Sequence, residues 1–109
     1  MSKEDTQEQL QRLQLIEQNA QQLLMQKHQF KSQLNEIESA LTELENTPEA
    51  YKIVGNIMVK TTQQALKKEL SEKKEMVELR ISTLEKQEQQ LREKAESLRK
   101  IVVGKLEEK

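Results

Sequence analysis

One histidine, His28, and 19 acidic side chains are the groups through which this 109-residue chain could perform acid–base or metal chemistry. Both kinds of chemistry need several such groups to converge on one point. His28 lies between Lys27 and Gln29 at a helix position predicted to face solvent, and the carboxylates alternate with lysine and arginine on exposed helix faces. Cysteine is absent, and Gly55 and Gly104 lie too far apart to form a phosphate-binding loop. The sequence therefore predicts a protein that is not an enzyme and that uses no metal or cofactor.

Charge and hydropathy argue against two further classes of protein. Lysine and arginine number 18 against 19 acidic residues, for a net charge of −1, whereas a nucleic-acid-binding protein carries a basic face. No run approaches the roughly 18 consecutive apolar residues of a membrane helix. The polar first residues, 1–6, lack the apolar segment of a signal peptide. We expect a cytoplasmic protein that binds neither nucleic acid nor membrane.

Large apolar side chains are too few for the core of a globular monomer. The only aromatic residues are Phe30 and Tyr51, and tryptophan is absent. A compact core built from this composition would not offset the conformational entropy lost on folding. The sequence therefore predicts an elongated or oligomeric structure, and its length allows one domain, residues 1–109.

Two long segments carry the seven-residue repeat of a coiled coil. Glycine and proline are absent from each of them, which predicts helices over about 6–46 and 62–103. The a and d positions of the first repeat are Leu13, Ile16, Ala20, Leu23, Lys27, Phe30, Leu34, Ile37, Leu41 and Leu44. The corresponding positions of the second are Leu70, Lys74, Val77, Ile81, Leu84, Glu88, Leu91, Ala95, Leu98 and Val102. The predicted fold class is all-α dominated, with a long antiparallel two-helix coiled coil and one β-hairpin between the helices.

The most consistent antiparallel alignment brings the two apolar seams together layer by layer. Its layers include Leu34–Val77, Phe30–Ile81, Ala20–Leu91 and Ile16–Ala95. It also predicts two attractive ion pairs beside the seam, Glu17–Arg92 and Lys31–Glu78.

Three charged residues, Lys27, Lys74 and Glu88, interrupt the seams. Buried polar residues at core positions can select the alignment and partner of a coiled-coil helix. Alternatively, the lysine stems lie along the seam while their ammonium groups reach water. We favour the second interpretation for the lysines, and we expect Glu88 to reach water because a two-helix coil is thin.

The segment between the helices has the pattern of a β-hairpin, over residues 51–60. Pro48 ends the first helix, because proline cannot continue it. Two runs rich in β-branched residues flank Gly55–Asn56, which fits a type II′ turn, and pairing across this turn makes both faces of the ribbon apolar. Such a ribbon must be covered by other chains, so we expect subunits to meet here. The residues assigned to this oligomerisation hairpin are Tyr51, Ile53, Val54, Gly55, Asn56, Ile57, Met58 and Val59.

The chain ends hold more apolar residues than one seam can bury. An antiparallel hairpin of helices brings both ends to its open tip. The residues in question are Leu10, Leu13, Ile16, Leu98, Ile101, Val102, Val103 and Leu106. They form either a slightly over-hydrophobic helix end or oligomer contact, or an exposed apolar surface that binds other polypeptides.

The pattern Tyr51-Lys52-x-Val54-Gly55-Asn56-x-x-Val59-Lys60 between two heptad helices resembles the β class of prefoldin subunits. The resemblance covers essentially the whole chain. Lys86-Gln87-Glu88 in the second helix is similar to the basic-Gln-Glu pattern of that class, and a single hairpin separates it from the α class.

This resemblance implies a hexamer of two α and four β subunits, whose hairpins assemble into a double β-barrel body. It also implies that the tips bind unfolded proteins and pass them to a group II chaperonin without ATP. The function expected on these grounds is that of an ATP-independent molecular chaperone, or holdase. The alternative is a passive coiled-coil scaffold or tether, which would have no use for apolar residues beyond its seam.

Overall fold

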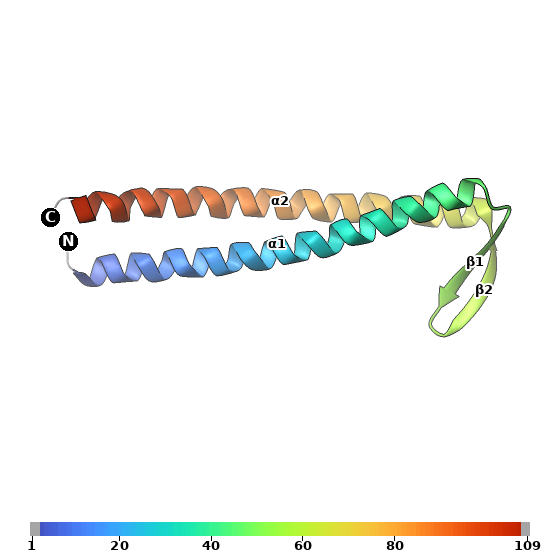
Figure 1. The fold of residues 1–109 in the computed structure, drawn as a ribbon, viewed down its shortest axis with the longest axis horizontal. Coiled ribbons are helices and arrows are strands. Elements are labelled where there is room, and N and C mark those ends of the chain that lie inside the picture. Colours follow the sequence, from blue (N-terminus) through green and yellow to red (C-terminus); the bar gives the residue numbers. More distant parts are fainter. Residues whose placement is uncertain (1–2, 108–109) are drawn as a thin grey trace. The chain divides into compact units, whose positions relative to one another are not determined.

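A computed structural model describes the backbone of residues 3–107 and the side chains of residues 5–105. Its elements follow in the order α1 (Lys3–Glu45), β1 (Glu49–Val54), β2 (Ile57–Thr62) and α2 (Gln63–Glu107) (Figure 1). The two strands pair antiparallel. Two long helices with a two-stranded hairpin between them confirm the fold class predicted for the chain.

The chain divides into two compact units. The hairpin unit is Gln29–Ile81 and contains β1, β2 and the helix segments on either side of them. The terminal unit contains the rest of α1, up to His28, and the rest of α2, from Ser82 onward. In each unit the helix segments run antiparallel, because residues farther along α2 contact residues nearer the start of α1.

The core of the hairpin unit lies on the predicted seam. Ile37, Val77 and Ile81 are buried together. The half-buried residues packed against this cluster are Phe30, Leu34, Leu41 and Leu70. The cluster thus draws on the apolar seams of both helices, as the sequence predicts, whereas the pairing of individual layers stays a prediction.

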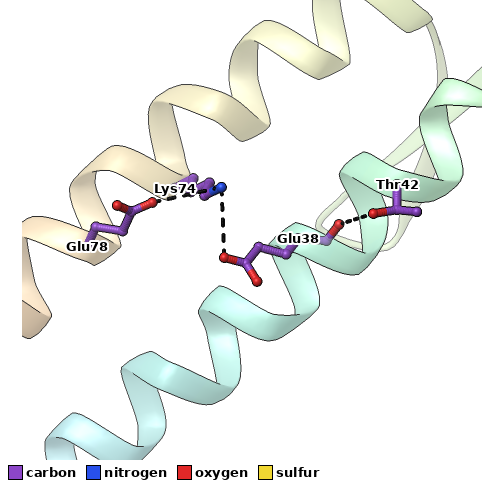
Figure 2. Close-up of polar contacts among 4 residues, drawn as sticks. All are labelled: Glu38, Thr42, Lys74 and Glu78. Carbon is purple, nitrogen blue, oxygen red and sulfur yellow. Dashed lines mark hydrogen bonds and ion pairs between the residues drawn. The ribbon is translucent and has the colours of Figure 1, made fainter.

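Lys74, the charged residue of this seam, extends to the edge of the helix pair. Figure 2 shows its ammonium between Glu38 of α1, 3.8 Å away, and Glu78 of α2, 4.0 Å away. The Lys74 side chain is 36% exposed, so these ion pairs are screened by water and contribute little to stability. The prediction that Lys74 reaches solvent is confirmed. The predicted Lys31–Glu78 pair is wrong, because Glu78 turns along its own helix toward Lys74.

Hydroxyl groups mark the junctions between helices and hairpin. Thr47 Oγ1 donates a hydrogen bond to the carbonyl oxygen of Glu43 at 2.9 Å, just before Pro48. Thr62 Oγ1 accepts a hydrogen bond from the backbone N–H of Ala65 at 3.0 Å, which makes Thr62 the N-cap of α2. The side-chain amide of Gln63 donates to the carbonyl oxygen of Leu44, and this bond ties the start of α2 to the end of α1.

Replacing Thr62 with alanine should destabilise the chain by about 1 kcal/mol, because the Ala65 N–H loses its partner. Chemical unfolding followed by circular dichroism measures the change. Thr62→Ser keeps the hydroxyl and should retain most of the stability. Equal losses in both variants would contradict a capping role.

The hairpin has the predicted register. Val54 pairs with Ile57, Ile53 with Met58, and Lys52 with Val59. Gly55 has φ of 63°, and no other described residue has a positive φ. A type II′ turn needs this conformation at its first central position only, so Gly55–Asn56 forms the turn expected from the sequence.

α2 continues to Glu107, beyond the end predicted near residue 103. Gly104 lies within the helix, and the space around it would accept a Cβ. Glycine weakens a helix by about 1 kcal/mol. A partly buried hydrogen bond of 2.9 Å from Lys105 Nζ to Gln9 Oε1 fastens this end to α1, which favours the helical continuation.

Candidate functional site

The hairpin exposes apolar side chains on both of its faces. The register places Tyr51, Ile53 and Met58 on one face and Val54, Ile57 and Val59 on the other. All six are exposed, Ile53 to 73% and Ile57 to 67%. Large apolar side chains at such exposure on both sides of one ribbon are unfavourable in water. The hairpin therefore has the properties of a surface that another chain covers.

One part of the hairpin is fixed to its own unit. Ala50 at the start of β1 is buried. Lys52 Nζ lies 3.5 Å from Glu69 Oε1 on α2, which gives a partly exposed link between strand and helix. The start of β1 also borders a groove whose apolar lining residues are Ala40, Leu44, Ala50, Tyr51, Leu66 and Leu70. The start of β1 is thus packed against its own unit, whereas the residues near the turn remain exposed.

The terminal unit carries the second group of candidate residues, at the end where the first and last turns of the helices meet. Lys105 Nζ donates a hydrogen bond to Gln9 Oε1 there. Figure 1 shows the corresponding ends of α1 and α2 side by side. Leu10, Ile101 and Val103 are 43%, 45% and 51% exposed. These three residues lie off the seam and form an accessible apolar set.

The remaining predicted tip residues belong to the seam. Leu13, Ile16 and Leu98 are half-buried, and Val102 is 5% exposed. The side chain of Leu106 lies outside the described residues. The structure therefore separates the predicted tip residues into exposed ones and ones that hold the helices together.

Two polar contacts join the helices beside this apolar set. Besides Gln9–Lys105, Arg99 donates a 2.8 Å hydrogen bond to Glu17 Oε1, and both side chains are about half exposed. The predicted partner of Glu17 was Arg92, and that prediction is wrong. Arg99 follows Arg92 by one heptad in α2, and the Lys27–Glu88 and Gln9–Lys105 contacts likewise bring α1 against residues about one helical turn farther along α2 than the predicted alignment does.

Lys27 and Glu88, the other two charged seam residues, pair with each other. Lys27 Nζ lies 2.8 Å from Glu88 Oε1, and the side chains are only 16% and 14% exposed. Apart from this ion pair, the buried Glu88 Oε1 has no polar partner among the described residues. The expectation that both groups would reach water is wrong, because the two helices place Lys27 opposite Glu88, whereas the predicted alignment places it opposite Leu84.

Sequence reasoning passed over some exposed apolar residues of the helices. Leu15 and Met76 are among the exposed large apolar side chains, and both lie away from the seam and from the hairpin. No heptad or hairpin pattern singles them out. Leu24 and Met25, also off the seam, are exposed as well.

Two other kinds of site are absent from the residues that the structure describes. These residues form no cluster of three or more histidine, cysteine or acidic side chains placed to hold a metal ion. Within the same part of the chain, neither α1 nor α2 contains an apolar stretch that could cross a bilayer. The exposed hairpin and the exposed end of the terminal unit remain the features that need an explanation.

Comparison with known proteins gives one family. A family model described as "Prefoldin subunit" matches residues 7–109. A prefoldin subunit beta of Sulfurisphaera tokodaii is 42% identical over 101 residues, which cover 90% of this chain and 81% of that protein. A prefoldin subunit beta of Archaeoglobus fulgidus is 43% identical over 93 residues, covering 82% of this chain and 80% of that protein.

A solved structure agrees with these sequences. The crystal structure of the prefoldin beta subunit from Thermococcus strain KS-1 superposes with a TM-score of 0.89 at 36% identity. The superposition covers 94% of this chain and 92% of that one. The resemblance drawn from Tyr51–Lys60 is thereby confirmed, and the chain belongs to the prefoldin subunit family, in its β class.

Proposed function

We propose that this chain is a subunit of an ATP-independent molecular chaperone, which assembles through the hairpin and holds unfolded polypeptides at the exposed end of the terminal unit. The family supports membership of a hetero-oligomer of prefoldin subunits. In the finer proposal, two α subunits and four β subunits form a cytoplasmic hexamer, in which the hairpins close a double β-barrel. The complex then passes its clients to a group II chaperonin.

The observation that carries the holdase proposal is the exposed apolar set Leu10, Ile101 and Val103. Unfolded proteins share no sequence, only exposed apolar groups, so a receptor for them should be apolar and should impose little geometry. A two-helix structure needs its a and d positions for its own stability, and these three residues lie outside them. A passive scaffold offers no reason to keep them there.

Each such site binds weakly, because three partly exposed side chains bury little area. Several subunits in one complex would present several copies to the same client. Once one copy binds, the others meet the client at high effective concentration, which raises the overall affinity without any new contact. The two parts of the proposal are therefore linked, since assembly through the hairpin supplies the repeated sites.

Suppression of aggregation separates the chaperone from the scaffold. The complex assembled with α-class prefoldin subunits, added at a near-stoichiometric ratio without nucleotide, should keep a chemically unfolded protein from aggregating on dilution. Light scattering measures the effect, and the unassembled chain at equal subunit concentration provides the comparison. If the assembled complex leaves aggregation unchanged, the holdase proposal fails and the scaffold stands.

A further inference from the structure

The charged pair inside the seam of the terminal unit has a role beyond packing. We propose that Lys27–Glu88 is a specificity device, which makes α1 pair with an α2 helix and prevents α1 helices of two copies from pairing with each other.

The burial of the pair distinguishes it from the other ion pairs. Lys27 and Glu88 are each less than one-sixth exposed, whereas the remaining ion pairs of the described residues join side chains that are more than one-third exposed. Glu88 Oε1 also lacks a hydrogen-bond partner, so Lys27 alone compensates its charge. A buried pair of this kind contributes little net stability, since desolvation offsets the attraction. Its presence in the seam therefore needs a reason other than stability.

The seam of α1 supplies that reason. Lys27 is the only charged residue among its a and d positions, so a second α1 has no seam carboxylate to offer. Parallel pairing of two α1 helices would set a against a and bring the two Lys27 ammonium groups together. Antiparallel pairing would set Lys27 against an apolar d residue, where its charge is buried without a partner. Only α2 provides Glu88.

Apolar residues alone would not make this choice. The other a and d positions of both helices are leucine, isoleucine, valine, alanine and one phenylalanine, apart from Lys74 near the start of α2. Such positions accept one another with small differences in energy. A chain that exposes its hairpin for association with other copies can also form unwanted contacts between two α1 helices. The Lys27–Glu88 pair disfavours these contacts, because two α1 helices would bring like charges together or bury a charge without a partner.

A cysteine reporter tests the proposal, because the native chain has no cysteine. Ala20 occupies an a position of α1, so in Ala20→Cys a disulfide between copies reports parallel α1–α1 contact. The experiment compares the fraction of disulfide-linked dimer in a glutathione buffer. The backgrounds are the otherwise native chain, Lys27→Leu/Glu88→Leu, the charge swap Lys27→Glu/Glu88→Lys, and Lys74→Leu as the matched lysine-to-leucine control on α2.

We expect the double leucine variant to raise the linked fraction about tenfold, since it removes the repulsion without leaving a buried charge. The swap should stay at the native level, because its α1 again carries one seam charge whose only partner is on α2. Lys74→Leu should also stay at the native level, because it leaves the α1 seam unchanged.

Circular dichroism and thermal unfolding provide the second measurement. The double leucine variant should keep its helix content and unfold at the native temperature or above. A folded double variant with no more linked dimer than the native background would overturn the proposal. So would a swap variant that dimerises like the double leucine variant.

Discussion

Aspartate in place of Ile53 or Ile57 should abolish assembly with partner subunits while leaving the helices of the chain formed. The two residues lie on opposite faces of the hairpin and are 73% and 67% exposed in the single chain. In the unassembled chain a carboxylate at either position is exposed to water, so it destabilises the fold little. If each face becomes covered in the complex, the same carboxylate is buried without a partner, at a cost of several kcal/mol per copy. The affinity for partner subunits should then fall by about a hundredfold or more.

Native mass spectrometry of the chain mixed with α-class prefoldin subunits measures this loss, and circular dichroism verifies the helices. Ser71→Asp is the matched control, because it adds the same charge to an exposed position of α2 in the hairpin unit, outside the hairpin itself. It should assemble like the native chain. A complex of native mass formed by Ile53→Asp or Ile57→Asp would show that the corresponding face is not an interface.

The elements could be predicted from the sequence because their determinants are local. The seven-residue repeat and the absence of glycine and proline predict two helices, and Pro48 and Gly55 predict the position and type of the turn. Register in the hairpin then follows from the turn length alone, and the structure has that register. The sequence predicts the end of α2 too early, because the helical continuation is favoured by a contact between Lys105 and Gln9, which lie far apart in the sequence.

Ion pairs were the least predictable part. The heptad pattern indicates which edge of a helix a charged residue occupies. It does not indicate which of two residues one heptad apart will lie opposite a given side chain of the other helix. Glu17 therefore pairs with Arg99 instead of Arg92. The sequence predicts that both Lys27 and Glu88 reach water, the lysine because its stem can lie along the seam and the glutamate because a two-helix coil is thin. Their mutual distance of 2.8 Å depends on where the two helices lie against each other.

The exposed tip residues could be named from the sequence only as a group. Composition indicated an excess of apolar residues near the chain ends, but not which of them the seam would bury. The structure divides the group, with Val102 buried and Leu10, Ile101 and Val103 exposed. This division makes a clean functional test possible, since a variant can remove accessible apolar area without weakening the helix pair.

Serine at Leu10, Ile101 and Val103 together should leave helix content and the mass of the complex unchanged, yet lower client capture about tenfold or more. The three side chains lie off the seam, so their loss removes little packing between α1 and α2. Weak sites that act together lose affinity multiplicatively, because every subunit in the complex loses its contact at once. Capture is measured as the concentration of complex needed to halve the aggregation of an unfolded protein.

The matched control replaces Leu15, Leu24 and Met25 with serine. These residues are also exposed and lie in the same unit, but they belong to α1 alone and lie farther along it from the helix ends. If clients bind at the ends, the control captures them like the native complex. If the control loses capture and the first variant keeps it, clients bind along α1 and the assignment to the ends is wrong. Equal losses in both would mean that exposed apolar area counts wherever it lies, because clients then bind along the whole unit and not at a defined end.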